Sequence, residues 1–548
     1  MATTHEVTNQ PPPLVDYNVF TSDRALEDVI RHGEASWAHA ALAQLGIRAG
    51  SEEAQAWGVE ANRNTPVATT HDRFGHRIDE VAYTPAYHRL MEVATANGLH
   101  ASAWRTATPG AHVARAAGFL VWSQVEAGHG CPISMTHAAL PTLRLQPDLY
   151  AEWAPAIMSS TYHPRLQPVR EKGSALFGMA LTEKQGGSDV RANTTRAVPA
   201  GSGGPGSEYL LTGHKWFCSA PMSDAFLVLA QAPGGLSCFL LPRVLPDGTR
   251  NRIALQRLKD KLGNRSNASA EVEYDGASAW LIGEEGRGVR VIIEMVNFTR
   301  LDCTIGSAAG MRQAVAQAIH HATFRSAFGK LLKDQPLMRN VLADLALESE
   351  AATLTALRLA RACDRAGESE HEAGIKRIGT ALSKYWICKR NAPHVAEALE
   401  CLGGNGYVEE SILPRLYREA PLNSLWEGAG NVNALDVLRA FAREPRALDA
   451  YFAEVEAAAS ADARLAASVA RIRDELADPE QAEVRARRIV ESMALAFAAA
   501  VVLATSPDFV ADAFLESRIA GNWGRAFGTL PAGLRLSEIV ERASPHAA

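Results

Sequence analysis

The sequence predicts a mainly α-helical protein with a β domain in its middle. Before residue 175, alanine-rich amphipathic segments such as AYHRLMEVATANGLH (86–100) repeat apolar residues at helical spacing. Between 176 and 285 the chain changes to short runs rich in β-branched and aromatic residues, separated by glycine, proline and aspartate, which predict strands joined by turns. Long helical periodicity returns after 286. Because strands and helices do not alternate, this order argues against a Rossmann domain.

The same changes of pattern divide the chain into four predicted domains. An N-terminal helical domain, 1–175, is followed by the middle β domain, 176–285. Segment 286–440 contains long helical stretches that we expect to form an antiparallel four-helix bundle. The last segment, 441–548, is again helical and rich in alanine and arginine, and EPRALD (444–449) is the predicted linker into it.

Bulk composition excludes several classes of protein. A net charge of −6 over 548 residues gives no basic field of the kind that marks a nucleic-acid-binding protein as a whole. The seven cysteines form no CxxC pair, so neither a metal site nor a disulfide framework is predicted. The start resembles no secretory signal, and the longest apolar run, ALAFAAAVVLA (494–504), is too short to span a bilayer and predicts a buried helix. We therefore expect a cytoplasmic protein without a membrane partner.

Two motifs are misleading when read alone. GSGGPG (201–206) matches a dinucleotide fingerprint in letters, but it contains a proline and precedes a strand instead of opening a helix. It therefore predicts a hairpin loop. His320 and His321 are adjacent in a helical run and do not share a face, so we expect packing or surface roles for them instead of metal binding.

Two stretches of the middle domain carry groups that suit a ligand. In MALTEKQGGSDV (179–190), Thr182 and Ser188 offer hydroxyl donors, and the glycine at 187 lets backbone N–H groups approach a phosphate or the edge of a flavin ring. The alternative is an ordinary turn. In GHKWFCSAP, Trp216 can form the wall of a ring system, although a tryptophan beside a strand is more often core.

Two stretches of the bundle add weaker signals. RSAFGKLLKDQ places Arg325, Phe328 and Gln335 around a loop that leads into a helix, where an arginine can pair with a pyrophosphate. The alternative is a solvated helix end. CLGGNGY places Gly403 and Gly404 after a helix, which by itself is an ordinary C-cap.

The stretch SLWEGAGN (424–431) sets a carboxylate, Glu427, between a tryptophan and a run of small residues. In an open loop this is an ordinary solvated glutamate. In an apolar pocket the charge is costly, and it then indicates a function.

Taken in this order, the motifs resemble the acyl-CoA dehydrogenase family. The chain has LTEKQGGSD, then Lys-Trp at 215–216, RSAFG at 325–329, the glycine pair at 403–404 and Trp-Glu-Gly at 426–428. The match covers about 80–440 and implies a helical domain, a β-barrel-like middle domain and a four-helix bundle. The stretches GHRIDEVAYTPAYH, LKDKLGNRSNASAEVE and PLNSLWEGAGN carry a second resemblance, which covers nearly the whole chain. It is to the alkylation-response flavoproteins of this family, which have an extra C-terminal helical domain, hold FAD, form homotetramers and are associated with double-stranded DNA.

The resemblance implies a role for each matching residue. Glu427 becomes the general base that takes the α-proton of an acyl thioester, with a pKa raised by an apolar wall. The substrate pocket is implied for Trp426, Gly428, Phe298 and Arg300. FAD binding is implied for a set shared between the middle domain and the bundle: Met179, Leu181, Thr182, Gly187, Ser188, Trp216, Ser219, Arg325, Phe328, Gln335, Gly403, Gly404 and Asn431.

The sequence departs from the family pattern at several positions. Ala429 and Asn431 stand where many members have threonine and glutamine, and Glu400 stands where a glutamine precedes the glycine pair. Asn297 stands where acyl-CoA binders often have an acid. These departures weaken the case for CoA recognition more than the case for FAD.

The C-terminal segment gives mixed evidence on DNA. Residues 441–548 contain twelve arginines, no lysine and sixteen acidic residues, so a DNA-binding face has to be segregated. Exclusive use of arginine suits phosphate binding, whereas the alternative is surface charge and intersubunit ion pairs. The predicted DNA-contacting residues are Arg485, Arg487, Arg488, Arg518 and Arg525.

The leading hypothesis is an FAD protein of the alkylation-response type that binds duplex DNA without sequence specificity and protects it, with weak dehydrogenase activity. The first alternative is a metabolic acyl-CoA dehydrogenase that uses Glu427 on a medium or branched acyl-CoA. A third hypothesis is a flavin scaffold with neither activity.

Overall fold

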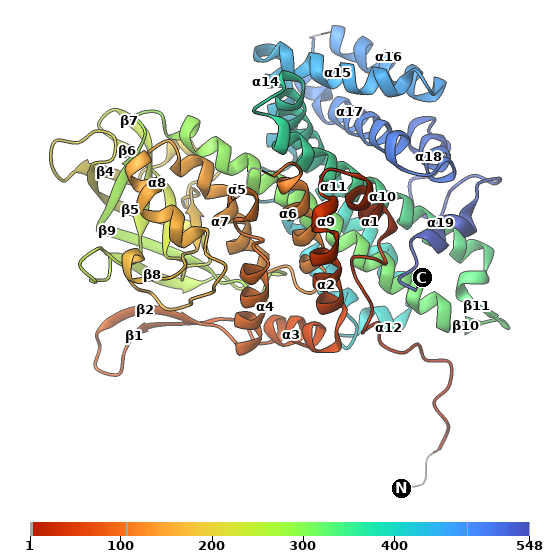
Figure 1. The fold of residues 1–548 in the computed structure, drawn as a ribbon, viewed down its shortest axis with the longest axis horizontal. Helices are drawn as coiled ribbons and strands as arrows, with labels where there is room; N and C mark the ends of the chain where they lie inside the picture. Colours follow the sequence, from red (N-terminus) through yellow and green to blue (C-terminus); the bar gives the residue numbers. More distant parts are fainter. Residues whose placement is uncertain (1–3, 106–107, 479, 547–548) are drawn as a thin grey trace. The chain divides into compact units, whose positions relative to one another are not determined.

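The computed structural model describes residues 4–105, 108–478 and 480–546, and within them the chain forms two compact units (Figure 1). We call residues 56–107 and 126–302 the β unit, and residues 1–55, 108–125 and 303–548 the helical unit. The fold class predicted from the sequence, mainly helical with a central β domain, is confirmed. The four predicted domain boundaries stay a prediction.

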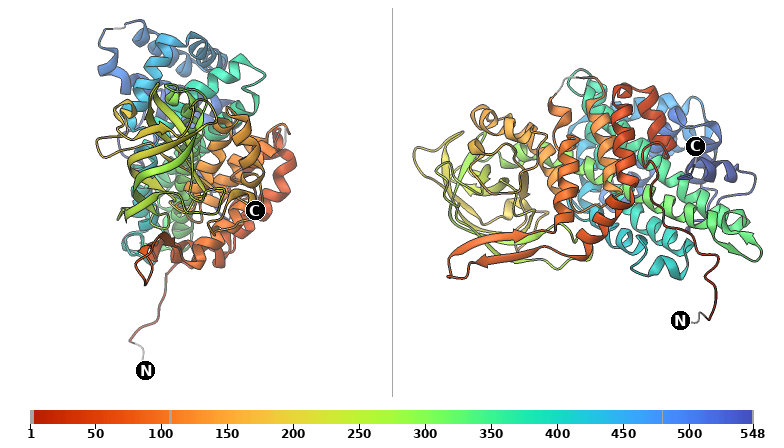
Figure 2. Two further views of the ribbon diagram at one scale, coloured as in Figure 1. Left: turned by 90° about the vertical axis from the view of Figure 1, so that its left-hand side faces the viewer. Right: turned by 60° about the horizontal axis from the view of Figure 1, so that its bottom comes forward.

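A seven-stranded sheet, shown from two sides in Figure 2, forms the core of the β unit. Five strands pair in a ring, because β6 pairs with both β4 and β7 while β5 and β9 complete the path. Strands β3 and β8 extend it by pairing with β6 and β9. The bounds are β3 Phe177–Ala180, β4 Arg196–Pro199, β5 Glu208–Ser219, β6 Ala225–Ala232, β7 Gly235–Pro242, β8 Ile253–Leu258 and β9 Ser269–Ile282.

Apolar side chains that point into the ring of strands form the core of this barrel. Strand β6, AFLVLAQA, is buried on nearly every residue, and its Phe226 and Val228 lie in the same apolar cluster as Phe239 and Leu241 of β7. GSGGPG joins the antiparallel strands β4 and β5, so the hairpin-loop prediction is confirmed. A two-stranded ribbon and several helices complete the unit: β1 Val67–His71, β2 Arg77–Ala82, α4 Pro85–Ala96, α5 Ser102–Arg105, α7 Gly130–Leu143 and α8 Pro147–Ile157.

Long helices form the helical unit. Helix α10 (Pro336–Arg365) packs against α11 (Glu370–Cys401). Helix α9 (Gly288–Phe324) begins in the β unit and continues into the helical unit. The N-terminal helices are α1 Arg24–His32, α2 His39–Gly50 and α6 Ala111–Ser123, while α3 Glu52–Arg63 begins in this unit and ends in the β unit. The later elements are the strands β10 Ser326–Ala327 and β11 Lys330–Leu331 and the helices α12 Gly404–Tyr407, α13 Leu413–Glu419, α14 Gly430–Arg443, α15 Pro445–Ala459, α16 Ala463–Ala477, α17 Ala482–Thr505, α18 Asp508–Phe514 and α19 Leu536–Arg542.

The C-terminal segment packs on the bundle within this unit. Helix α17 contacts α10, α11 and α14. By length and composition α17 could cross a membrane, but Val490, Phe497 and Val502 are buried, as in the core helix of a folded protein. The prediction that 494–504 forms a buried helix is confirmed. His320 is also buried, and its ring lies against those of Phe324 and His546.

Candidate functional site

The loop that follows β3, residues 181–189, rests on a buried ion pair. Glu183 Oε1 lies 2.7 Å from Lys215 Nζ, and neither side chain is exposed. Glu183 also accepts a hydrogen bond from the backbone of Thr194 at 2.7 Å. Burial alone would raise the pKa of Glu183, but the hydrogen bond and charge of Lys215 outweigh it and lower the pKa to about 2. Burial lowers the pKa of Lys215 to about 8. The ion pair therefore fixes the loop to strand β5.

The same loop also carries two uncharged donors, the hydroxyls of Thr182 and Ser188. Residues 184–189 are exposed, while Met179, Leu181 and Thr182 are half-buried. A Cβ on Gly187 would lie 2.4 Å from Thr182 Oγ1, so only glycine fits this close turn. Among the described residues no hydrogen bond engages the hydroxyl of Thr182 or Ser188. This donor set suits a flavin ring edge or a pyrophosphate.

Trp216 lies beside this loop. Its backbone N–H donates to the carbonyl of Thr182 at 2.8 Å, which joins β5 to the loop. Lys259 Nζ lies 3.2 Å from the centroid of the indole ring, a cation–π contact. Three residues further along β5, Ser219 lies opposite Ser269 with 3.3 Å between the hydroxyl oxygens. The structure thus brings together Thr182, Gly187 and Trp216, three of the middle-domain residues predicted for FAD.

The part of α9 in the β unit contains Phe298 and Arg300, and both are buried. The Phe298 ring packs edge-on against Trp104 at 5.1 Å and against His137 at 5.4 Å between ring centroids. Phe298 therefore belongs to an aromatic cluster. Its place in the substrate pocket stays a prediction.

In the helical unit, Glu427 lies in a strained turn between Leu422–Ser424 and α14. Its φ is 56° and that of Gly428 is 96°, so a non-glycine residue adopts the left-handed region. Lys384 of α11, which is buried, donates from Nζ to the carbonyl of Gly428 at 3.1 Å. Asn433 donates to the same carbonyl. These contacts hold a conformation that isolated residues rarely adopt.

Further contacts fix both ends of this turn. The indole N–H of Trp426 donates to Asn423 Oδ1 at 2.9 Å, and Asn423 in turn donates to the Ser307 hydroxyl at 3.2 Å. On the other side, Arg487 Nε donates to Asn431 Oδ1 at 2.8 Å. Asn431, predicted to bind FAD, and Arg487, predicted to bind DNA, are therefore partners of each other.

The bundle residues predicted for the cofactor meet on a short hairpin. Phe328 forms the exposed tip between β10 and β11, and Gln335 Nε2 donates to the carbonyl of Ala327 at 2.9 Å. The Arg325 guanidinium donates to the carbonyl of Asn9 in the N-terminal tail. Tail residue Gln10 accepts from Asn405, next to the exposed pair Gly403 and Gly404.

The tail contact continues through a side chain. Asn9 accepts from the Ser326 N–H at 2.8 Å and from its hydroxyl at 3.0 Å, and it donates to the Ser326 carbonyl at 2.8 Å. Because tail residues bond both to the hairpin and to Asn405, which follows the glycine pair, they link these two predicted cofactor segments.

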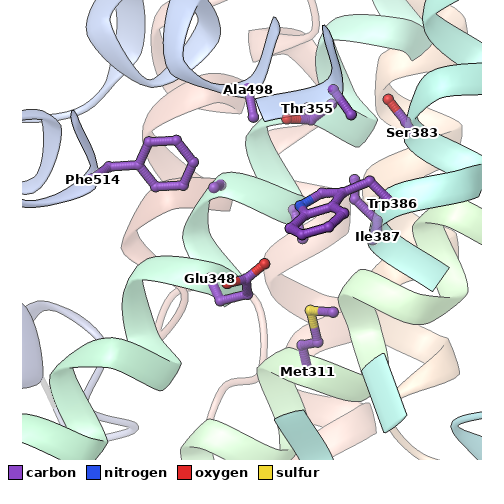
Figure 3. Close-up of a pocket in the computed structure, with 11 residues that line it drawn as sticks. Met311, Glu348, Thr355, Ser383, Trp386, Ile387, Ala498 and Phe514 are labelled. Atoms are coloured by element: carbon purple, nitrogen blue, oxygen red, sulfur yellow. The ribbon is translucent and has the colours of Figure 1, made fainter. Parts of the chain in front are cut away.

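One predicted DNA contact is wrong. Arg518 is buried with no exposed side-chain surface, and it forms ion pairs with Asp344 and Glu348 of α10. Glu348 also lines a 10 Å³ cavity with Met311, Trp386 and Phe514 (Figure 3). A guanidinium enclosed in this way cannot reach a duplex phosphate; it joins the C-terminal segment to the bundle instead.

The other arginines predicted to contact DNA differ in whether their guanidinium groups already have partners within the protein. Arg485 binds the Glu475 carboxylate at 2.9 Å and the carbonyls that end α16. Arg488 pairs with Glu475 as well. Arg525 is exposed, and within the described residues it has no partner.

Sequence reasoning missed the residues that support the two loops. Glu183 and Lys215 were within the quoted motifs, but one lies in the loop after β3 and the other in β5, so their pairing was not visible in the sequence. Lys384 and Asn9 gave no local signal, because their partners are 44 and 317 residues away.

Comparison with known proteins identifies the family. Three family models match: adaptive response protein AidB N-terminal domain over residues 9–164, acyl-CoA dehydrogenase middle domain over 178–277 and acyl-CoA dehydrogenase C-terminal domain over 286–442. The putative acyl-CoA dehydrogenase AidB of Escherichia coli strain K12 is 46% identical over 543 residues, which cover 98% of this chain and 97% of that protein.

Two further comparisons are with Caenorhabditis elegans. Its acyl-CoA dehydrogenase family member 11 is 32% identical over 450 residues, 79% of this chain and 72% of that protein. The crystal structure of C. elegans ACDH-11 in complex with C11-CoA superimposes with a TM-score of 0.86 at 26% identity, covering 95% of this chain and 93% of that one. The chain therefore belongs to the acyl-CoA dehydrogenase family, whose members use FAD, and it carries the AidB-type N-terminal domain.

Proposed function

We propose that the chain is an FAD-dependent dehydrogenase of acyl thioesters in which Glu427 is the catalytic base. The observation that carries this proposal is the geometry of the Glu427 turn. A left-handed glutamate costs free energy, and here hydrogen bonds from Lys384 and Asn433 to the next carbonyl offset that cost. A strained charged residue held in this way indicates a functional role more than an ordinary surface loop.

The residues of the β unit fit the proposed cofactor. The hydroxyls of Thr182 and Ser188 and the close turn at Gly187 would hold the flavin edge and pyrophosphate, and Trp216 would flank the ring. Neutral hydroxyl and backbone donors of this kind suit an anionic pyrophosphate without burying a further charge. When bound, FAD accepts the hydride that leaves the β-carbon of the thioester.

The protein's own side chains would do the remaining work. The Glu427 carboxylate would take the α-proton, which requires it to be ionised at rest and close to the substrate. Trp426, anchored through Asn423, would keep the turn from swinging away. Phe298 and its aromatic neighbours in the β unit would exclude water from the acyl chain. Arg300 in the β unit and Gly428 in the helical unit stay predicted substrate residues.

We also propose that the active form is a homotetramer. The supporting observation is the β10–β11 hairpin, whose tip residue Phe328 is fully exposed. A large aromatic side chain at a rigid tip favours insertion into a second copy, where Arg325 and Gln335 would reach the adenosine half of FAD. Sedimentation analysis of the protein and of Phe328→Ser tests this. A tetramer that is unaffected by the substitution would argue against the hairpin contact.

The decisive experiment mixes flavin-loaded protein anaerobically with a panel of medium and branched acyl-CoA thioesters. We expect at least one thioester to bleach the visible flavin absorption, and we expect Glu427→Gln to abolish the bleaching while retaining flavin. Absence of bleaching with the whole panel would overturn the proposed activity. A colourless protein that cannot be reconstituted with FAD would overturn the cofactor assignment as well.

A second proposed function is non-specific binding and protection of double-stranded DNA during the adaptive response to alkylation. The support is the AidB-type N-terminal domain and the 46% identity to E. coli AidB. Of the predicted arginines, exposed Arg525 remains the best suited to a phosphate. We expect salt-sensitive affinity for duplex DNA, with Arg525→Ala reducing the logarithmic salt slope by about 1. No measurable affinity at low salt would exclude this function.

A further inference from the structure

Helix α17 of the C-terminal segment contacts the start of α14, the helix that directly follows the Glu427 turn. Helix α17 packs against both α11 and α14, which Figure 1 labels. From α17, Arg487 donates a hydrogen bond to Asn431, the second residue of α14. Asn431 is only four residues after Glu427, so this contact acts on the part of the chain that sets the position of the carboxylate.

The start of α14 depends on support from other segments. Its N-cap residue is Ala429, and no side chain caps the helix there. Three donors bind around the start of the helix, although in these bonds none of them accepts from its free N–H groups: Lys384 from α11, Asn433 from within α14, and Arg487 from α17. Lys384 and Asn433 bind the carbonyl of Gly428, whereas Arg487 binds the side chain of Asn431. Removing Arg487 leaves that side with no hydrogen-bonding support from another helix among the described residues.

A second cation, Lys389, lies near Arg487 at the start of α14. A Cβ on Gly430 would lie 3.4 Å from Lys389 Nζ and 3.5 Å from an Arg487 terminal nitrogen, so the chain passes between two cations. Burial first, and then the charges of Arg487 and Lys384, lower the pKa of Lys389. Lys389 and Arg487 therefore lie close enough for their charges to repel. Within the described residues Arg487 forms no ion pair with a carboxylate, unlike its neighbours Arg485 and Arg488.

We propose that Arg487 is a positioning residue for Glu427: through Asn431 it fixes the first turn of α14 and thereby the left-handed conformation at Glu427. The inference deepens the proposed dehydrogenase function, on which its catalytic consequence rests. It gives the C-terminal segment, which lies outside the three matched family models, a direct role at the turn that carries the base.

The test compares four variants of the flavin-loaded full chain. Arg487→Met removes the donor but keeps a long apolar stem, and Arg487→Lys keeps one donor in reach of Asn431. Asn431→Ala removes the acceptor. Arg488→Met is the matched control, because it lies next in sequence on the same helix but pairs with Glu475.

The first readout does not depend on catalysis. Amide hydrogen exchange over residues 427–434 should become about tenfold faster in Arg487→Met and Asn431→Ala, as expected for loss of a charge-assisted hydrogen bond, and stay unchanged in Arg488→Met. Arg487→Lys should restore part of the protection. Equal exchange in Arg487→Met and Arg488→Met would overturn the inference, whatever the protein does with thioesters.

The second readout applies if the wild-type protein reacts with a thioester. The limiting rate of flavin bleaching should fall about tenfold in Arg487→Met, because the base is no longer aligned. The thioester concentration that gives half of the limiting rate should change little, because substrate binding is unaffected. Arg487→Lys should recover part of the rate. A rise in that concentration with an unchanged limiting rate would contradict positioning. An unreactive wild-type protein would remove the proposed activity but would leave the exchange result to decide on the contact.

Discussion

Two loops carry the predicted chemistry, and each rests on a fully buried lysine. Under the 181–189 loop of the β unit, the Lys215 ammonium is 2.7 Å from the Glu183 carboxylate. Under the Glu427 turn of the helical unit, the Lys384 ammonium donates to a backbone carbonyl at 3.1 Å and, within the described residues, has no carboxylate partner. One buried charge is therefore neutralised and the other is not.

The difference shows how the two loops are stabilised. Lys215 and Glu183 belong to neighbouring segments of one barrel, and each compensates for the burial of the other. Lys384 gains only a hydrogen bond to Gly428, so its burial costs free energy that the surrounding bundle must offset. The first loop is held by a strong local pair. The second is held by weaker contacts from three directions, which makes it the easier one to displace.

Lys215→Met should have the largest effect. It leaves the Glu183 carboxylate buried without its cation, which typically costs about 3–5 kcal/mol. The expected result is a markedly lower midpoint of chemical denaturation, followed by circular dichroism. Lys215→Met combined with Glu183→Gln should recover part of the loss, because both charges are then gone. A combined variant no more stable than Lys215→Met would show that the ion pair is not the cause.

Acid should weaken the same pair. Since the pKa of Glu183 is lowered from 4.5 to about 2, its contribution to stability is present above pH 4.5 and is lost as the pH falls from 4.5 towards about 2. Glu348, whose pKa is also lowered to about 2 by Arg390 and Arg518 despite its burial, titrates in the same window. The thermal midpoint should therefore fall less steeply over this window in the combined Lys215→Met and Glu183→Gln variant than in wild type. Parallel slopes would contradict the assignment to Glu183.

Lys384→Met should cost much less than Lys215→Met. It removes one hydrogen bond to Gly428 but also removes an ammonium that no carboxylate neutralises, so we expect a change within about 1 kcal/mol in the free energy of unfolding. The comparison of the two lysine-to-methionine variants by the same denaturation assay tests the contrast directly. An equal loss in the free energy of unfolding for the two variants would mean that both lysines stabilise the protein to the same extent.

Asn9→Ala should have the smallest effect. It removes the exposed hydrogen bonds between the N-terminal tail and Ser326, which orient the hairpin but bury little surface. If the hairpin contacts FAD as proposed, the affinity for FAD measured by fluorescence quenching should fall by about threefold. The thermal midpoint of the flavin-free protein should not change, and a drop there without weaker FAD binding would assign the tail a purely structural role.

Sequence alone determined the kinds of element and the neighbours that lie within one motif. Periodicity separated the helical segments from the strands, and the confirmed fold class follows it. Gln335 bonds to Ala327 within the RSAFGKLLKDQ motif, because a short turn is set by nearby sequence. Thr182 and Trp216, from the two successive motifs of the middle domain, are joined by a backbone hydrogen bond. Family membership followed from the order of these motifs.

Tertiary structure decided which charged residues are free. Arg518 lies in an arginine-containing stretch that looked exposed, yet its partners Asp344 and Glu348 are 174 and 170 residues earlier. Arg487 finds Asn431 at a separation of 56 residues. Periodicity and spacing describe how a helix faces its own neighbours in the chain, whereas the identity of the buried partner depends on which distant helix packs against that face. That physical limit is why the motifs predicted the loops, but only the packed chain revealed what holds Glu427 in place.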